Sequence, residues 1–327
     1  GSIGSELVRQ IADFSCKKII IIDQAESALY NLEIELGEKN KNAHFEFILA
    51  NIQNYGRMKR IFEHFKPDFV YHVAAYKHVP VMEENPYEAV ITNISGTKII
   101  ADLALEINAE KFVMVSTDKA VNPTNVMGAS KRIAEMYVQI LNQKGKTKFI
   151  TTRFGNVLGS NGSVIPLFNE QIAKGGPVTI THPEITRYFM TITEACQLIL
   201  EAGCMGNGGE IFIFDMGESV KIVDLAKKMI KLSNLTLGKD IQIVYTGLRP
   251  GEKLYEELLN NKENTITTYH PKIMIAKVRE MNSDITLQQI ELLIDLLNSQ
   301  DNYKLVKQMK ILVPEYKSQN SVYEKLD

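Results

Sequence analysis

Three neighbouring residues in the first half of the chain combine the functional groups of an acid–base site. Thr117, Asp118 and Lys119 follow the run Lys-Phe-Val-Met-Val-Ser at residues 111–116, which is typical of a buried strand. A hydroxyl, a carboxyl group and an amine at one strand end supply a hydrogen bond, an acid and a base. The triplet therefore predicts proton-transfer chemistry where this strand ends. The alternative is that Asp118 and Lys119 form a solvated turn.

A second lysine follows on a predicted helix. Met127 and Lys131 are four residues apart near the start of a helix predicted over residues 128–142, so they share one helix face. With the strand-end triplet, this spacing resembles the active site of the extended short-chain dehydrogenase/reductase family, where tyrosine usually stands in place of Met127. A thioether cannot transfer a proton. The departure indicates the branch that carries Thr-Asp-Lys with Met-x-x-x-Lys, the UDP-N-acetylglucosamine 4,6-dehydratases of polysaccharide and glycan biosynthesis. Otherwise Met127 only fills the core.

The resemblance implies a role for each of these residues. NAD would oxidise C4 of the sugar, which makes the C5 hydrogen acidic, and the hydride would return to C6 once water is lost. Thr117 would hold O4, Asp118 would be the acid at C6 and Lys119 the base at C5. In the absence of tyrosine, Asp118 is expected to accept the O4 proton, directly or through Thr117. Lys119 needs a lowered pKa to act as a base, and burial beside a cation such as Lys131 would provide it.

The beginning of the chain resembles the second half of a glycine-rich cofactor loop. Gly1, Ile3 and Gly4 run into helical periodicity, and the N–H groups of a helix starting at Gly4 would face a pyrophosphate. Asp23 ends a predicted strand 19 residues after Gly4, where a carboxylate binds the ribose hydroxyls and repels a 2′-phosphate. NAD is therefore the expected cofactor. The alternative for Asp23 is that it only caps the next helix.

The resemblance assigns further NAD contacts to small or polar residues after the predicted strands. Asn51 stands where the family usually has aspartate beside adenine, and this departure weakens only that contact. Small residues after residue 72 would let NAD lie against the backbone, and the helix lysine would bind the nicotinamide ribose. The residues so assigned are Asn51, Ile52, Ala74, Ala75, Tyr76, Asn93 and Lys131.

The second half of the chain carries the residues that the resemblance assigns to substrate. The most specific segment is Arg-Pro-Gly-Glu-Lys at residues 249–253, which offers a guanidinium for phosphate oxygens and a carboxylate for the uridine ribose. The same segment could be an ordinary turn. The expected substrate-binding residues are Lys77, His78, Asn156, Val164, Arg187, Arg249 and Glu252.

Strands and helices are predicted to alternate through the first half of the chain. Apolar runs indicate strands at residues 18–23, 45–49, 69–72, 111–116 and 149–154, with helices at residues 25–37, 55–65, 87–106 and 128–142. This alternation requires crossover connections, so the fold class is α/β, a Rossmann-like doubly wound parallel sheet. Beyond residue 154, a smaller α+β lobe is predicted, with strands at 178–181, 211–215, 241–245 and 273–276 and helices at 192–202 and 220–233.

Three regions are expected from this pattern. Residues 1–155 form the NAD-binding domain, residues 156–280 mainly the substrate-binding lobe with interleaved segments, and residues 281–327 a helical tail with helices at 287–297 and 303–312. Residues 260–268 are predicted to be a surface loop. The strand that should precede the glycine-rich loop is missing, which indicates the catalytic part of a longer protein. Longer members of the branch carry an N-terminal membrane region.

Composition restricts the partners. The net charge of −2 gives no reason to expect nucleic acid or an anionic membrane as a partner. Cys16, Cys196 and Cys204 are far apart without a CxxC spacing, which disfavours both a disulfide framework and a metal site. No apolar run of 18 residues or more occurs. A cytoplasmic catalytic domain that binds a UDP-N-acetylhexosamine is expected, and the family implies dimerisation through helices 87–106 and 128–142.

Several functions stay open. The methionine variant resembles the dehydratases that retain configuration at C5, and an inverting dehydratase with 5-epimerase activity is the nearest alternative. A UDP-sugar 4-epimerase would have no use for an acid–base pair at C5 and C6, so Asp118 and Lys119 disfavour it. A non-catalytic NAD-binding regulator is disfavoured for the same reason.

Overall fold

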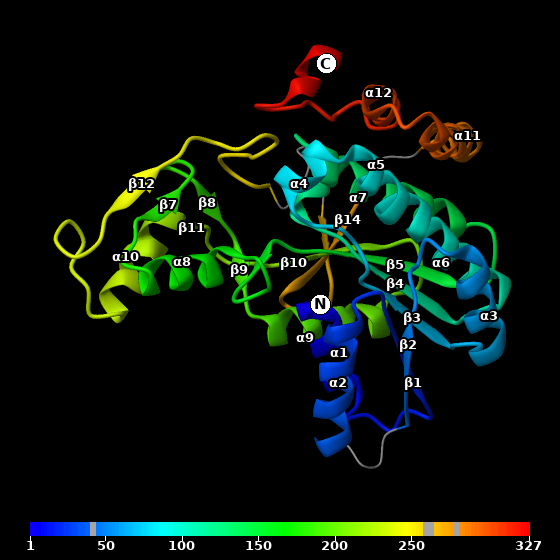
Figure 1. Ribbon diagram of the computed structural model, residues 1–327. Helices are drawn as coiled ribbons and strands as arrows, with labels where there is room; N and C mark the ends of the chain where they lie inside the picture. Colours follow the sequence, from blue (N-terminus) through cyan, green and yellow to red (C-terminus); the bar gives the residue numbers. More distant parts are fainter. Residues whose placement is uncertain (40–43, 258–264, 278–280) are drawn as a thin grey trace.

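A six-stranded sheet forms the centre of the computed structural model, which describes residues 1–39, 44–257, 265–277 and 281–327 (Figure 1). The strand order is β13-β14-β10-β5-β4-β3, with β3, β4, β5 and β10 parallel, β14 antiparallel to β10 and β13 antiparallel to β14. The strands are β3 (Phe69–His72), β4 (Lys111–Val115), β5 (Lys148–Arg153), β10 (Ile211–Phe214), β13 (Thr265–Thr267) and β14 (Ile273–Ala276). The predicted α/β class is therefore confirmed. Residues 265–267 are a strand rather than part of the predicted loop, whose residues 260–264 lie outside the described ranges.

A separate parallel pair, β1 (Ile19–Asp23) and β2 (Phe45–Leu49), lies beside this sheet. Within the described part of the chain, β1 and β3 each have only one neighbouring strand, and they do not pair with each other. The side chains of both strands line one cavity. The two sheets are therefore separated along this edge.

Helices cover both faces of the central sheet, as crossover connections require. α3 (Tyr55–Phe65), α6 (Thr97–Glu106) and α7 (Val126–Leu141) pack side by side on one face, whereas α1 (Ser2–Ile11) packs on α9 (Ile192–Met205) on the other. The helix predicted over residues 87–106 is not uniform. It is α5 (Pro86–Ala89), then a π-helical segment at Val90–Gly96, then α6.

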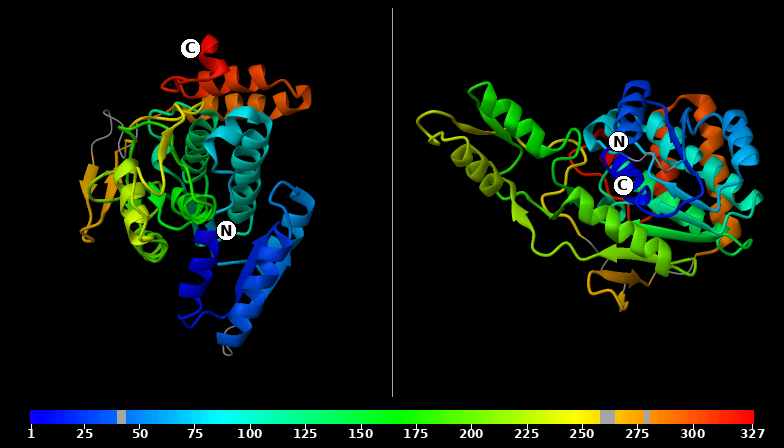
Figure 2. Two further views of the ribbon diagram at one scale, coloured as in Figure 1. Left: turned by 60° about the vertical axis from the view of Figure 1, so that its left-hand side comes forward. Right: turned by 90° about the horizontal axis from the view of Figure 1, so that it is seen from below.

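A smaller lobe extends away from the sheet and has its own apolar core (Figure 2). It contains α8 (Val164–Ala173), β7 (Val178–Ile180), β8 (Thr186–Arg187), β11 (Val220–Lys221), α10 (Ile222–Leu232) and β12 (Ile243–Tyr245). Phe168 and Ile172 of α8 meet Ile222 and Ile230 of α10 in this core. Residues 192–214 return to the central sheet as α9 and β10.

The C-terminal helices α11 (Ser283–Asp295) and α12 (Asn302–Leu312) lie across α5 and α7 at the top of Figure 1. Ile290, Leu293, Leu305 and Met309 of these helices belong to the same apolar core as α7. Every residue of α7 except Gln139 is buried. The expectation that α7 forms a dimer interface is therefore wrong for this arrangement, because the chain's own C-terminal helices cover it. Among the described helices, none is long and apolar enough to cross a membrane.

Candidate active site

The acid–base triplet lies at the carboxyl end of β4, where the sequence places it. Thr117 caps a short 3₁₀ turn, Asp118–Ala120, by accepting a 3.4 Å hydrogen bond from Lys119 N. Asp118 N donates to Phe154 O, just after β5, at 3.1 Å. The turn is thereby fixed between two parallel strands, at the sheet edge where ligands bind in such folds.

Asp118 and Lys119 contact each other directly. Lys119 Nζ lies 2.9 Å from Asp118 Oδ1 and 3.1 Å from Asn156 Oδ1, and Thr117 Oγ1 donates to the same Asp118 oxygen at 2.9 Å. Asp118 is 1% exposed, and its Oδ2 has no hydrogen-bond partner in the described part of the chain. The site thus joins a hydroxyl, a carboxylate and an amine, and it leaves one buried carboxylate oxygen unsatisfied. Such an atom is a feature of functional sites.

The structure corrects the expected electrostatics of Lys119. Burial lowers the pKa of Lys119, and the Arg187 cation acts in the same direction, but the charges of Asp118 and Glu256 outweigh both and raise the pKa above its usual value. The expectation of a lowered pKa is therefore wrong in this state. Arg187, rather than Lys131, is the cation that acts on Lys119.

Met127 and Lys131 lie on α7 and line the same cavity as Thr117 and Lys119. Lys131 Nζ donates to Val115 O at 2.8 Å, and burial lowers its pKa to about 8 against the opposing charge of Glu135. Met127 is buried, so its thioether fills space beside the triplet. The predicted sharing of one helix face thus brings both side chains to the site.

Gly128 allows α7 to approach the 3₁₀ turn at Asp118–Ala120. A Cβ at this position would lie 2.2 Å from Lys119 O and 3.0 Å from Lys119 C, and backbone atoms cannot move aside as a side chain can. The Asn125 side chain caps this helix by accepting from Gly128 N at 2.7 Å. The start of α7 and the backbone of Lys119 are therefore packed as one unit.

Replacing Gly128 with alanine is expected to destabilise the fold by about 1–3 kcal/mol, the usual cost of overpacking, and to displace Lys119. Urea unfolding measures the first effect. Gly37→Ala is the matched control: Gly37 lies within α2 (Glu26–Lys39) with no atom within 4 Å of an added Cβ. That change should stabilise by about 0.5–1 kcal/mol. Equal stability of Gly128→Ala and the wild type would contradict the packing described here.

One cavity of 2210 Å³ connects the residues predicted for cofactor, chemistry and substrate. It runs from the edges of β1 and β3 past the triplet to the loop that carries Arg249. Its lining includes Gly1, Ile3, Gly4, Asp23, Asn51, Ile52, Ala74, Ala75, Tyr76, Lys77, His78, Asn156, Val164, Arg187 and Glu252. Residues predicted from separate parts of the sequence are thus brought to one continuous surface.

The cofactor end of the cavity fits a dinucleotide. A methyl group added at Gly1 or Gly4 would meet no atom within 4 Å, and no side chain caps α1, so its first turn can face an anion. Asp23 Oδ2 lies 3.6 Å from the Gly1 nitrogen, which places the carboxylate beside this helix start. Asp23 Oδ1 accepts from Ala25 N at 2.8 Å, so the carboxylate also makes the turn into α2. The donor set therefore matches a pyrophosphate followed by a ribose.

Asn93 supports the cofactor end instead of facing it. Its side chain accepts from Tyr76 N at 2.8 Å and donates to Tyr76 O at 3.0 Å and Ser130 Oγ at 2.9 Å. Asn93 lies within the π-helical segment, a local geometry that often occurs at functional sites. Asn51 likewise accepts from Gln53 N, at 2.8 Å. Both side chains shape the backbone that lines the cavity.

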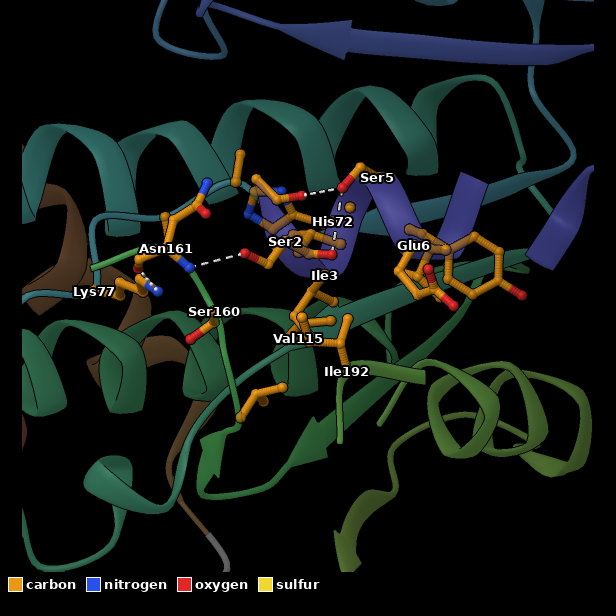
Figure 3. Close-up of a pocket in the computed structure, with 18 of the residues that line it drawn as sticks. Ser2, Ile3, Ser5, Glu6, His72, Lys77, Val115, Ser160, Asn161 and Ile192 are labelled. Atoms are coloured by element: carbon orange, nitrogen blue, oxygen red, sulfur yellow. Dashed lines mark hydrogen bonds between the residues drawn. The ribbon is translucent and has the colours of Figure 1, made fainter. Parts of the chain in front are cut away.

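The substrate end is formed by three loops. Lys77 Nζ donates to Asn161 O at 2.9 Å, and Asn161 N donates to Ser2 Oγ at 3.1 Å, so these contacts join the residues after β3, the loop before α8 and the start of α1 (Figure 3). Burial lowers the pKa of both Lys77 and His78, and the charges of Lys77 and Arg249 act further on His78. A nearby anion would satisfy the Lys77 and Arg249 cations, and the neutral His78 ring can donate a hydrogen bond to it.

The predicted substrate residues Arg187 and Glu252 already have partners in the chain. Arg187 donates to Thr186 O at 2.7 Å and Lys253 O at 2.9 Å, and it lies 3.5 Å from Glu252 Oε1. Glu252 Oε2 accepts from Arg249 N at 3.1 Å. Arg187 therefore holds the 249–253 loop in place, whereas the Arg249 side chain is 57% exposed, donates to Glu252 Oε1 at 3.2 Å and lines the cavity.

Sequence reasoning missed a C-terminal strap, residues 317–319, that supports the site. Lys317 N donates to Pro123 O at 3.1 Å and Gln319 N to Thr124 O at 3.2 Å, while Gly251 N donates to Gln319 O at 2.7 Å. The strap joins the loop before α7 to the loop of Arg249. These bonds involve backbone groups, so no side-chain pattern in the sequence could have indicated them.

Comparisons with known proteins agree with this geometry. A family model described as "Polysaccharide biosynthesis protein" matches residues 1–278. The capsular polysaccharide biosynthesis protein CapD of Staphylococcus aureus is 52% identical over 311 residues, 94% of this chain and 51% of CapD. The chain thus spans about half the length of that relative.

Two solved structures share the fold. The X-ray structure of Pen from Bacillus thuringiensis is 33% identical with a TM-score of 0.77, and the match covers 90% of this chain and 94% of Pen. A double mutant of DesIV, a dTDP-glucose 4,6-dehydratase from Streptomyces venezuelae with NAD and DAU bound, is 21% identical with a TM-score of 0.69. That match covers 80% of this chain and 86% of DesIV, and it shows similarity of fold.

Proposed function

Because the chain belongs to the family of polysaccharide biosynthesis proteins, we propose that it is an NAD-dependent lyase that removes water from UDP-N-acetylglucosamine. The product is the 4-keto-6-deoxy sugar, with retention at C5. The observation that supports this most is the contact between Asp118 and Lys119 beside Met127 and Lys131. An acid and a base at one point are what elimination across C5 and C6 requires.

Each step of the proposed reaction is assigned to particular residues of the chain. When bound, NAD supplies a hydride acceptor at C4 and a hydride donor at C6. Thr117 holds O4 by a hydrogen bond, and Asp118 accepts the O4 proton through the 2.9 Å contact with Thr117 Oγ1 or directly. Lys119 removes the C5 proton, Asp118 then donates its proton to the departing C6 hydroxyl, and Lys119 returns a proton to C5 once the hydride has reached C6. Asp23 and Lys131 bind the two riboses of NAD.

The rest of the cavity suits a diphosphate-linked sugar. Lys77 and Arg249 offer cationic groups to the diphosphate, the neutral His78 ring offers a hydrogen bond, and Asn156 lies beside Lys119, where the sugar would react. Cys16, Cys196 and Cys204 are free thiols, which suits a reducing compartment, so we place catalysis in the cytoplasm. The proposed homo-oligomer would use a surface other than α7.

Heavy water distinguishes this reaction from its alternatives. The enzyme is incubated with UDP-N-acetylglucosamine in heavy water, and the sugar is followed by NMR and mass spectrometry. Loss of one water with one deuterium gained at C5 is expected, and the C5 coupling constants separate retention from inversion. A change at C4 without water loss would instead establish a 4-epimerase. Bound NAD without any turnover of this sugar would favour a regulator or another substrate.

A further inference from the structure

Glu256 is a buried carboxylate at the active site that no sequence motif indicates. It is 7% exposed and lines the cavity beside Lys119. Its Oε1 lies 3.6 Å from Lys119 Nζ and 3.8 Å from Arg187 Nε. Its Oε2 is buried without a hydrogen-bond partner among the described residues. The carboxylate is thus paired by charge but poorly hydrogen-bonded.

Stability alone does not account for this arrangement. A buried charge is costly unless it is both paired and hydrogen-bonded, and both of the contacts of Glu256 Oε1 are longer than a normal hydrogen bond. Asp118, on the same amine, likewise has an unsatisfied buried oxygen, Oδ2. Two incompletely satisfied carboxylates around one amine indicate a site arranged for proton transfer rather than for packing.

The charged groups that face Lys119 are Asp118, Glu256 and Arg187, and Asn156 adds a neutral acceptor. In the proposed reaction Asp118 carries a proton between the oxidation and elimination steps. During that interval Glu256 is the one anion among these groups that still faces the amine.

We propose that Glu256 is a positioning residue, whose carboxylate holds the Lys119 amine toward Asn156 and remains its counter-charge while Asp118 is protonated. This inference rests on the proposed function, because only the proposed reaction includes an interval in which Asp118 is protonated and therefore neutral.

The consequence for Lys119 has a definite sign. Asp118 and Glu256 raise the pKa of Lys119, whereas burial and Arg187 lower it. Removal of the Glu256 charge therefore lowers the pKa of Lys119. A base acts in its neutral form, so activity is lost as pH falls through this pKa, and the acidic limb of kcat moves to lower pH.

The test compares Glu256→Gln with Glu257→Gln. Glu257 is the adjacent glutamate, with a side chain 41% exposed and paired with Lys253 rather than Lys119. The acidic limb of kcat is expected to move down by about one pH unit in Glu256→Gln, as for loss of a charge within 4–6 Å, and to stay fixed in Glu257→Gln. Glu256→Asp, which keeps the charge, should return the acidic limb of kcat to its wild-type pH. A uniform fall in kcat with an unchanged limb would overturn the proposal.

A second readout does not depend on turnover. Competitive labelling with trace acetic anhydride, followed by peptide mass spectrometry, gives the pKa of the Lys119 amine itself. The pKa of Lys119 is expected to be lower in Glu256→Gln than in the wild type. An identical labelling curve in wild type and variant would overturn the inference. If no variant loses water from the sugar but labelling still shows the shift, the proposed reaction fails while the contact between Glu256 and Lys119 stands.

Discussion

Asp118→Asn is expected to reduce the rate of water loss by about 10²–10⁴-fold, the usual contribution of an acid–base group. Asparagine keeps the shape of the side chain and the contacts with Thr117 and Lys119, but it can neither accept the O4 proton nor donate one at C6. Oxidation at C4 and loss of the C6 hydroxyl should therefore fail together. Stopped-flow absorbance of the reduced cofactor reports the first step, and mass spectrometry of the sugar reports the second.

Lys119→Met separates these steps. The variant lacks the base at C5 but keeps Asp118 and Thr117, so hydride transfer should persist while water loss stops. Asp284→Asn, an exposed aspartate on α11, is the control and should behave as the wild type. Water loss by Asp118→Asn at the wild-type rate would remove Asp118 from the chemistry. Loss of hydride transfer in Lys119→Met would show that Lys119 acts at O4 rather than at C5.

Glu135→Ala is expected to destabilise the protein by about 3–5 kcal/mol, because it removes one partner of a buried, doubly hydrogen-bonded ion pair with Arg153. Glu135 of α7 and Arg153 of β5 are each no more than 1% exposed. Their two contacts are 2.9 Å from Nε to Oε1 and 2.7 Å from Nη2 to Oε2. This pair fixes the helix of Lys131 to the sheet, so urea unfolding should show a large fall in the midpoint.

Two further measurements identify why Glu135→Ala loses stability. Replacing both partners by apolar residues, Glu135→Leu with Arg153→Met, should recover much of the stability, because no buried charge is then left unpaired. Burial raises the pKa of Glu135, but Arg153 and Arg132 outweigh it and hold the pKa below its usual value. The stability that the ionised carboxylate provides is thus present above its unfolded pKa of about 4.3 and is lost as pH falls through the lower folded value. A pH-independent difference between wild type and Glu135→Ala across this range would contradict the ion-pair account.

Most strands of the two parallel sheets were predictable because their apolar runs are short and bounded, whereas β13 was missed. Residues 45–49 of the two-stranded sheet and residues 69–72 and 273–276 of the central sheet were predicted with the bounds that the structure has. α4 (Val79–Glu84) and α8 were missed. In α4 a proline near the helix start, Pro80, interrupts the pattern, although proline is well tolerated there. The π-helical segment around Asn93 was not predicted, and within it Asn93 bonds to the backbone of Tyr76, 17 residues earlier in the chain.

In the candidate site, too, features set by local sequence were predictable and features set by distant residues were not. The strand-end position of Thr117, Asp118 and Lys119 follows from local sequence, and the structure brings these residues near Met127 and Lys131 as the spacing indicates. The electrostatics of Lys119 depended on Glu256 and Arg187, which lie far away in the sequence. Reasoning from motifs alone chose Lys131 as the neighbouring cation because it is close in sequence. In the folded chain, tertiary packing places the Arg187 cation beside Lys119 instead.

Transfer of deuterium within the sugar tests the central claim most directly. UDP-N-acetylglucosamine labelled with deuterium at C4 is given to the enzyme in ordinary water, and the product is examined by NMR. The account predicts loss of one water, with the deuterium recovered at C6 and a proton from solvent at C5. Deuterium that remains at C4 in a sugar with inverted configuration at C4 and an intact C6 hydroxyl would contradict the account and establish an epimerase.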